Sequence, residues 1–217
     1  MSYIHGKSII KIAVADDHEM FREAISAMID RFENCKVVAQ AATGIELLEK
    51  LRQKSNIDLV LLDIAMPEIN GYDAAVKIRD QFPDIKIVFC SMYNTELAIC
   101  RMIGTGANGF VDKSFSLNEL RRTIYNVMKK DHNHDGKIFF YYDGGNGHHD
   151  FSTYKLSDEE ITFMKLTCTE KPYKEIATEM HLTERQIDYL RESLFCRFDV
   201  HSRIGLAIIA HQSGVND

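Results

Sequence analysis

The feature that most constrains this chain is a fivefold alternation of strand-like and helix-like segments over its first 130 residues. Because each strand is followed by a helix, this rhythm predicts an α/β fold with a five-stranded parallel sheet, right-handed crossovers and helices on both faces. Apolar, β-branched runs predict the strands at residues 9–16, 36–42, 58–63, 85–91 and 108–113. The later helices are expected at residues 46–53, 72–82, 94–103 and 117–129.

The first helix has to be read from its apolar spacing. Apolar residues recur there at intervals of three and four, which is typical of one buried helix face. The face predicted to be buried comprises Phe21, Ala24, Ile25, Met28, Ile29 and Phe32. The third strand, by contrast, is apolar throughout, as expected for a strand that helices cover on both sides.

The rhythm stops at about residue 130. Residues 131–154 are rich in Gly, His and Asp and show no helical period, so we expect a linker between a domain at 1–130 and a domain at 155–217. Apolar runs also stay far below the roughly 20 residues that a membrane helix requires. Five cysteines without a C-x-x-C pair are typical of reduced thiols, and we therefore expect a cytoplasmic protein that binds no membrane.

The last domain is predicted to be small and all-helical. Ser157 followed by Glu160 forms a capping box for a helix over residues 158–168. A second helix is expected at 173–180 and a longer third helix at 184–198, with Thr183 as the N-cap of the third. The short turn between these two helices gives them the form of a helix-turn-helix. A last helix follows Ser202.

Polar residues stand where the predicted strands end. Asp16 and Asp17 end the first strand, Asp63 the third, Ser91 the fourth and Lys113 the fifth. Sites in open α/β sheets form at the carboxyl ends of strands, so these side chains are expected to converge. Clustered carboxylates repel one another unless a cation lies among them, and oxygen ligands suit Mg²⁺. The group predicts phosphoryl transfer to an aspartate; the alternative, that the acids only cap helices, explains one acid but not all five positions.

Four stretches carry a family resemblance: ADD at 15–17, DIAMPEING at 63–71, the strand end at Ser91 and FVDK at 110–113. Together they resemble the receiver domain of bacterial two-component response regulators. The resemblance implies a flavodoxin-like, doubly wound sheet with strand order 2-1-3-4-5. It also implies that a sensor histidine kinase phosphorylates Asp63.

The same resemblance assigns a role to each site residue. Asp17 and Asp63 would bind Mg²⁺ directly, with Asp16 nearby and the carbonyl oxygen of Ala65 as a backbone ligand. Lys113 would pair with the phosphoryl group. Ser91 is the hydroxyl expected to move toward that group, and Phe110 matches the switch aromatic. Two positions depart from the usual pattern: many members carry Tyr in place of Phe110, and Met92 is bulky where a small residue often stands.

The C-terminal stretches LSDEEI, KPYKEIATEM, LTERQIDYLRESLFCRF and SRIGLAIIAH resemble the LuxR-type helix-turn-helix. A receiver followed by this domain is the layout of the NarL/FixJ subfamily of transcription factors. The resemblance implies a homodimer that forms on phosphorylation and binds double-stranded DNA. It implies no enzymatic activity beyond self-catalysed phosphotransfer; a phosphatase of the aspartyl-phosphate class would need an acid or base at position 65, which is Ala.

The expected DNA-binding residues lie on and around the recognition helix. They are Lys174, Thr183, Arg185, Gln186, Asp188, Tyr189, Arg191, Glu192 and Arg203, with Arg197 as a further phosphate contact. The family usually has basic residues at the positions of Asp188 and Glu192, whereas residues 155–217 here carry 8 Lys/Arg against 11 Asp/Glu. A carboxylate can still accept a hydrogen bond from cytosine N4. The alternative is a regulator whose acidic output domain binds a protein partner instead of DNA.

Overall fold

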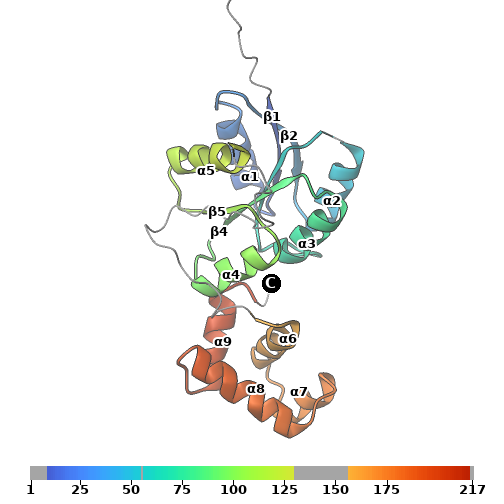
Figure 1. The fold of residues 1–217 in the computed structure, drawn as a ribbon, viewed down its shortest axis with the longest axis vertical. Helices are drawn as coiled ribbons and strands as arrows, with labels where there is room; N and C mark the ends of the chain where they lie inside the picture. The colour runs from blue at the N-terminus through green and yellow to red at the C-terminus, as the bar shows by residue number, and fades with distance from the viewer. Residues whose placement is uncertain (1–8, 55, 130–155, 216–217) are drawn as a thin grey trace, which may run out of the picture. The chain divides into compact units, whose positions relative to one another are not determined.

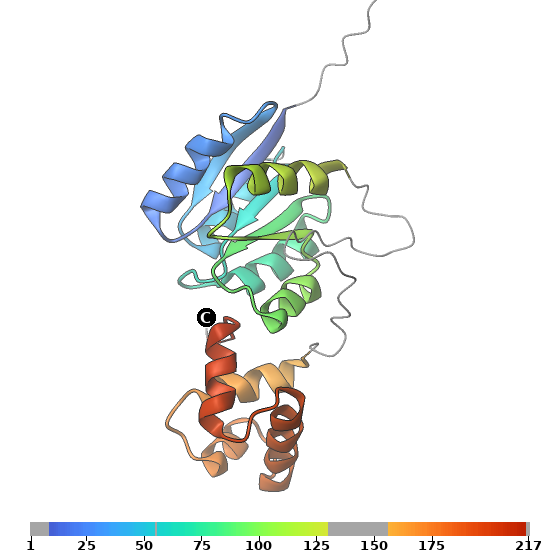
Figure 2. The ribbon, with the colours of Figure 1, turned by 90° about the vertical axis from the view of Figure 1, so that its left-hand side faces the viewer.

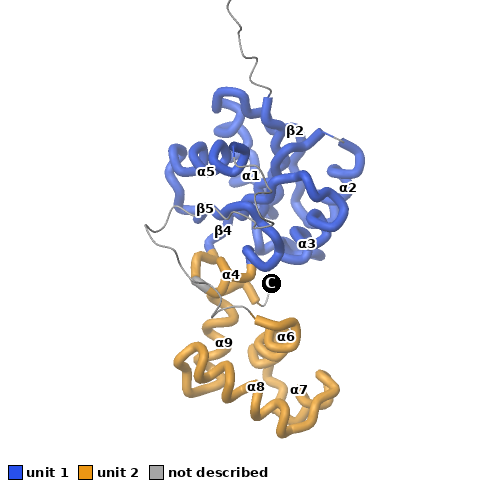
Figure 3. Tube along the Cα trace, in the orientation of Figure 1, with its two compact units in different colours: residues 1–92, 102–147 blue, residues 93–101, 148–217 orange. Residues whose placement is uncertain are grey.

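The computed structural model describes residues 9–54, 56–129 and 156–215. The chain divides into two compact units, Met1–Met92 with Met102–Gly147 and Tyr93–Arg101 with His148–Asp217 (Figure 3). The predicted linker at 131–154 lies outside the described residues. Among the described residues, no helix has both the length and the apolar character needed to span a membrane.

The first unit is built on a five-stranded parallel sheet whose order is β2-β1-β3-β4-β5, which confirms the predicted topology. Its strands are β1 (Ile10–Ala15), β2 (Cys35–Ala41), β3 (Leu59–Leu62), β4 (Lys86–Ser91) and β5 (Gly109–Asp112). Ala15 is in register with Leu62, and Ser91 with Asp112. The carboxyl ends of these strands therefore lie along one edge of the sheet, as the expected site requires.

Helices cover both faces of this sheet (Figure 1). They are α1 (Glu19–Ile29), α2 (Gly44–Gln53), α3 (Gly71–Gln81) and α5 (Leu117–Lys129). Helix α4 (Glu96–Gly104) follows β4 in the chain, and most of it is grouped with the second unit. A single apolar cluster joins α1 and α5 to alternate side chains of the strands, and it includes Ile25, Ile124 and Leu61. Burial of that cluster holds the two helices on the same face, while Figure 1 shows α2 and α3 on the other.

Helix α1 is rotated from the orientation that its apolar spacing predicts. Ile25 and Ile29 are buried as expected, but Ala24 is exposed and Met28 is 38% exposed, so these two assignments were wrong. Ser26 is buried in their place. Its hydroxyl donates to the carbonyl oxygen of Arg22 at 2.6 Å, and a polar group satisfied within its own helix can be buried at little cost.

Four helices, orange to red in Figures 1 and 2, form most of the second unit. They are α6 (Asp158–Thr167), α7 (Tyr173–Glu179), α8 (Glu184–Arg197) and α9 (Arg203–Gln212). The predicted caps are confirmed: Ser157 and Thr183 each form a capping box, and Ser202 accepts from the amide of Gly205. Ile187, Leu190 and Leu194 form the buried stripe of α8, and α8 therefore exposes its opposite side.

The segment Tyr93–Arg101 belongs to this second compact unit although it begins α4. Leu97 packs in the same apolar cluster as the helices α6–α9. The guanidinium of Arg101 donates to the carbonyl oxygens of Ser213 at 3.2 Å and Gly214 at 2.7 Å. These contacts join the start of α4 to the residues that follow α9.

Candidate functional site: a buried acidic cluster and an exposed helix face

Two buried aspartates lie side by side where β1 and β3 end. The amide of Asp16 donates to the carbonyl oxygen of Ala41 at 3.1 Å, and the amide of Asp63 donates to that of Ala15 at 2.9 Å. Each hydrogen bond continues the pairing of the sheet by one residue. Asp16 is only 2% exposed and Asp63 only 3%, so the sheet itself fixes both carboxylates away from bulk water.

Lys113 joins these carboxylates. Its amide donates to the carbonyl oxygen of Ser91 at 3.0 Å, which extends β5 beyond Asp112. Its Nζ lies 2.7 Å from Asp63 Oδ2 and 2.9 Å from Asp16 Oδ2. Lys113 Nζ also lies 5.0 Å from the centroid of the Phe21 ring. Spacing in the sequence placed Phe21 on a helix face but carried no signal of this cation–π contact.

Burial changes the acid–base behaviour of the cluster. It raises the pKa of Asp63 to about 6, and the neighbouring charge of Asp16 adds to the rise while Lys113 opposes it. Burial acts to lower the pKa of Lys113, yet its two carboxylate partners outweigh that effect and the pKa is raised. Near neutral pH, Lys113 is therefore cationic and Asp63 is mainly a carboxylate.

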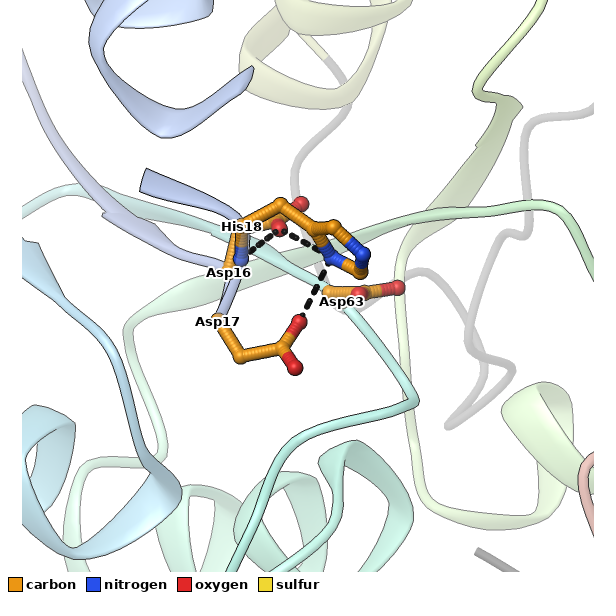
Figure 4. Close-up of side chains that lie close together, drawn as sticks. All are labelled: Asp16, Asp17, His18 and Asp63. Atoms are coloured by element: carbon orange, nitrogen blue, oxygen red, sulfur yellow. Dashed lines mark hydrogen bonds and ion pairs between the residues drawn. The ribbon is translucent and has the colours of Figure 1, made fainter. Parts of the chain in front are cut away.

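A third carboxylate, that of Asp17, lies beside His18 (Figure 4), and its side chain is 36% exposed. Potential ligand atoms of Asp16, Asp17, His18 and Asp63 lie within 4.8 Å of one another. His18 Nδ1 is 2.7 Å from Asp17 Oδ1, and His18 itself is the N-cap residue of α1 without a side-chain capping bond. Asp16 Oδ1 accepts from the amide of His18 at 2.9 Å, so this one acid also binds an amide at the start of α1, as the capping alternative allows for a single acid. His18 was not predicted as a possible ligand, because residue order alone places it only beside the acids.

The charges of this cluster fit a metal cation. Lys113 pairs with two of the three carboxylates and Asp17 lies beside His18, which leaves an excess of negative charge around the two buried acids. Such an excess is unfavourable without a further cation. Carboxylate oxygens are hard donors, and hard divalent cations prefer them. The residues present can therefore hold a metal ion.

The loop after Asp63 packs closely against the backbone of two glycines. A Cβ on Gly71 would lie 2.1 Å from the carbonyl oxygen of Asp63, and a Cβ on Gly44 would lie 2.6 Å from that of Ile69. Only residues without a side chain allow these approaches, which explains the glycine that ends the DIAMPEING stretch. Ala65 is half-buried in this loop; its assignment as a backbone metal ligand stays a prediction.

The remaining predicted receiver residues lie on β4 and β5. Ser91 is the last residue of β4 and is 1% exposed. Phe110 is 1% exposed on β5, in register with Phe89. Met92, which follows Ser91, is 66% exposed. The sheet therefore brings Ser91 to the carboxylate edge, while the switching roles of Ser91 and Phe110 stay predictions.

In the second unit, the expected DNA contacts separate into two groups. The first group is exposed on α8, at its N-cap or on α7, and comprises Lys174, Thr183, Arg185, Gln186, Asp188, Tyr189 and Glu192. The second group consists of three arginines that are half-buried and bound within the unit. Arg197 pairs with Glu160 at 2.8 Å, and Arg191 pairs with Asp188 at 2.8 Å.

Arg203 is the third of these arginines. Its guanidinium donates to the carbonyl oxygens of Thr167 at 2.9 Å, Leu166 at 3.3 Å and Thr169 at 2.7 Å. These groups end α6, where the helix dipole attracts a cation. Arg203 therefore connects the end of α6 to the start of α9. Residues more than thirty positions apart form these hydrogen bonds, so local sequence patterns do not predict them.

Comparison with known families agrees with both halves of this description. Residues 12–125 match the family described as "Response regulator receiver domain", and residues 154–210 match "Bacterial regulatory proteins, luxR family". The chain is a response regulator. It belongs to the NarL/FixJ type, which combines these two domains, as the sequence motifs predict.

Relatives of similar length share this layout. "Response regulator GacA" of Pseudomonas aeruginosa is 28% identical over 212 residues, which cover 96% of this chain and 99% of the relative. "Fimbriae Z protein" of Salmonella typhimurium is 29% identical over 205 residues, covering 90% and 93%. The structure of RcsB from Salmonella enterica serovar Typhimurium, described as bound to promoter rprA with phosphomimetic BeF₃⁻, superposes with a TM-score of 0.65 at 18% identity, covering 93% of this chain and 98% of RcsB. At that identity the likeness supports the fold alone.

Proposed function

We propose that this response regulator receives a phosphoryl group on Asp63 from a sensor histidine kinase and, in the phosphorylated state, regulates transcription by binding DNA as a homodimer. The observation that carries the first step is the buried pair of Asp16 and Asp63 with Lys113 bonded to both. The proposed role belongs to the cytoplasm. It includes no catalysis of other substrates.

The geometry supports Asp63 as the nucleophile. A carboxylate oxygen of Asp63 attacks the phosphorus, the new O–P bond forms, and the bond from phosphorus to the donor breaks. With a pKa of about 6, Asp63 is mostly ionised at neutral pH and needs no base to remove a proton. Lys113 supplies positive charge beside the incoming phosphoryl oxygens. Mg²⁺, held by Asp17 and Asp63 with Asp16 nearby, would neutralise further charge on that group.

The test is phosphorylation by a small donor such as acetyl phosphate with Mg²⁺, followed by intact-mass measurement. We expect one phosphoryl group on the wild type and none on Asp63→Asn. Asp84→Asn is the matched control, because Asp84 is an exposed aspartate of the same unit, outside the cluster, and its loss should leave the adduct unchanged. An undiminished adduct on Asp63→Asn would show that another residue is the acceptor.

Homodimer formation is the second step of the proposal. On α9, Ile204 is 72% exposed and Ile208 is 51% exposed. Residues four apart lie on the same face of a helix, so the two form an apolar strip that a second copy can cover. Sedimentation at matched micromolar concentrations should show more dimer after phosphorylation. Identical profiles for both states would contradict this step.

DNA binding is the third step, and α8 with its exposed face supports it. Because several arginines of the unit are bound internally, we expect only two or three phosphates to be neutralised per subunit. A dimer should then give a slope of log K against log salt of about −4 to −5. Replacing Asp188 and Glu192 by Lys should raise affinity for scrambled DNA and steepen that slope. If this double variant binds scrambled DNA no better than the wild type, α8 does not face DNA, and the acidic output domain binds a protein partner.

A further inference from the structure

Arg191 is held by two exposed acids of its own helix. Its Nη1 lies 2.8 Å from Asp188 Oδ1, and its Nη2 lies 3.8 Å from Glu192 Oε1. The Arg191 side chain is 27% exposed, against 55% for Asp188 and 76% for Glu192. The cation therefore lies beneath the carboxylates, and the carboxylates form the outer surface of α8.

An aromatic ring holds Arg191 from the other side. Its guanidinium carbon lies 5.3 Å from the centroid of the Tyr173 ring, at the start of α7. Tyr173 is stacked on the buried Phe163 of α6, with centroids 6.1 Å apart and planes inclined by 16°. The guanidinium of Arg203, at the start of α9, lies 5.2 Å from the same ring. The helices α6, α7, α8 and α9 thus each contribute a side chain to the surroundings of Arg191.

Each of the two arginines that share the Tyr173 ring has its own negative partners. The carbonyl oxygens that end α6 surround Arg203. Asp188 and Glu192 are the corresponding partners of Arg191. If Arg191 turned outward to a DNA phosphate, it would leave the Tyr173 ring and expose two carboxylates to the phosphates without a counter-charge. Both consequences are unfavourable.

We infer that Asp188 and Glu192 are the specificity-determining residues of this helix, that they accept hydrogen bonds from cytosine amino groups, and that Arg191 positions them rather than contacting DNA phosphate. This inference rests on the proposed DNA-binding function. In the major groove, cytosine presents only an N4 amino donor. Adenine also presents an amino donor, N6, but its N7 acceptor lies beside that donor and repels a carboxylate.

The spacing of the two acids fits this reading. Residues four apart on a helix have Cβ atoms about 5–6 Å apart, and two base-pair steps span about 7 Å. Tyr189, 75% exposed, lies beside Asp188 on the outer surface. We therefore expect preferred sites to carry two cytosines within two base-pair steps, on either strand, in each half-site.

The experiment selects bound duplexes from a random pool with the phosphorylated full-length chain and its variants Asp188→Asn, Glu192→Gln and Arg191→Met. Each acid variant replaces an exposed side chain by its isostere, and circular dichroism confirms the fold. We expect each acid variant to lose about 10-fold in preference for cytosine at one position. Arg191→Met should weaken the cytosine preference at both positions.

The salt series separates a positioning role from a phosphate contact. With Arg191→Met, the slope of log K against log salt should change by less than half of the 0.9 or so that one lost phosphate contact removes per subunit. Arg185→Met is the matched control: Arg185 is an exposed arginine of the same helix, so its loss should reduce the slope by about 0.9 per subunit and leave the base preference intact.

Each contrary result has a distinct meaning. If Asp188→Asn and Glu192→Gln select the same sites as the wild type, the acids do not read bases and the inference is overturned while DNA binding stands. A slope reduced by about 0.9 in Arg191→Met, with base preference unchanged, would make Arg191 a phosphate contact. If the wild type selects no sequence and binds no duplex, the proposed DNA-binding function fails and the inference fails with it.

Discussion

The two units of this protein use the same arrangement of charges in opposite environments. In the first unit, Lys113 lies between Asp16 and Asp63, and all three side chains are largely buried. In the second, Arg191 lies between Asp188 and Glu192, whose side chains are 55% and 76% exposed.

Solvent decides how strongly each group of charges interacts. Coulomb energies are several times larger in a protein interior than at a wet surface, and withdrawing the charges from water is costly as well. The buried group consequently has a raised Asp63 pKa and an excess of negative charge that favours a cation. The exposed group costs little to maintain, so its acids remain available to a partner.

Removing the central cation of each charge group should give the largest difference in stability between the two groups. Lys113→Met leaves two buried carboxylates without a counter-charge, and we expect it to lower the free energy of unfolding by about 3 kcal/mol at pH 8 without divalent cations. Arg191→Met should lower it by less than about 1 kcal/mol. Urea unfolding followed by circular dichroism suits a chain that contains no tryptophan. Equal losses would mean that burial does not distinguish the two groups.

The pH dependence of stability tests the buried group directly. The pKa of Asp63 is raised to about 6 in the folded state, whereas an unfolded aspartate titrates near 3.9. Between these values folded Asp63 binds more protons than unfolded Asp63, so the contribution of Asp63 to stability falls as pH rises from about 4 to 6. Asp63 accounts for on the order of 2–3 kcal/mol of that fall.

Asp63→Asn should remove this part of the slope. Unfolding measured at pH 4.5 and pH 7, without divalent cations, should show the wild type losing about 2 kcal/mol more than the variant over that interval. Added Mg²⁺ should reduce the loss in the wild type, because a ligand that binds only the folded state stabilises it. The same slope in both proteins would show that Asp63 titrates normally.

Arg203→Lys sharpens the comparison within the second unit. Lysine keeps the charge but lacks the planar guanidinium that donates to three carbonyl oxygens, so we expect a loss of about 2 kcal/mol in the free energy of unfolding and faster hydrogen exchange at the end of α6. Arg185→Lys, at an exposed position of α8, is the control and should change stability by less than about 0.5 kcal/mol. No difference between the two variants would show that Arg203 does not hold α6.

Much of the fold and of the phosphoacceptor cluster follows from local patterns. A run such as DLVLLD predicts both a doubly covered strand and an acid at its carboxyl end, because strand polarity is set by the chain itself. The parallel order of the strands then brings Asp16, Asp63 and Lys113 to one edge. Capping residues such as Ser157 and Thr183 act over three positions, and they too were predicted correctly.

The positions in α1 that the sequence did not predict correctly depend on polar or distant neighbours, which the spacing of apolar residues does not reveal. Ser26 can be buried because its hydroxyl donates to a carbonyl oxygen one turn away, and the inward face of α1 is therefore shifted toward Ser26 and away from Ala24 and Met28. Phe21 contacts Lys113, which is 92 residues later in the chain. Spacing within one helix carries no information about such a partner.

The amino-acid sequence by itself determined the order of elements, the helix caps and which acids stand at strand ends, since these depend on residues within a turn or a strand of one another. Only the tertiary structure decided how the charges of the second unit are used. The sequence suggests that Arg203 and Arg191 are free cations, but the carbonyl oxygens at the end of α6, the Tyr173 ring at the start of α7 and the acids of α8 bind them once the helices pack. An arginine binds whichever carbonyl, carboxylate or ring the fold brings within reach, and that choice is made across helices rather than along the chain.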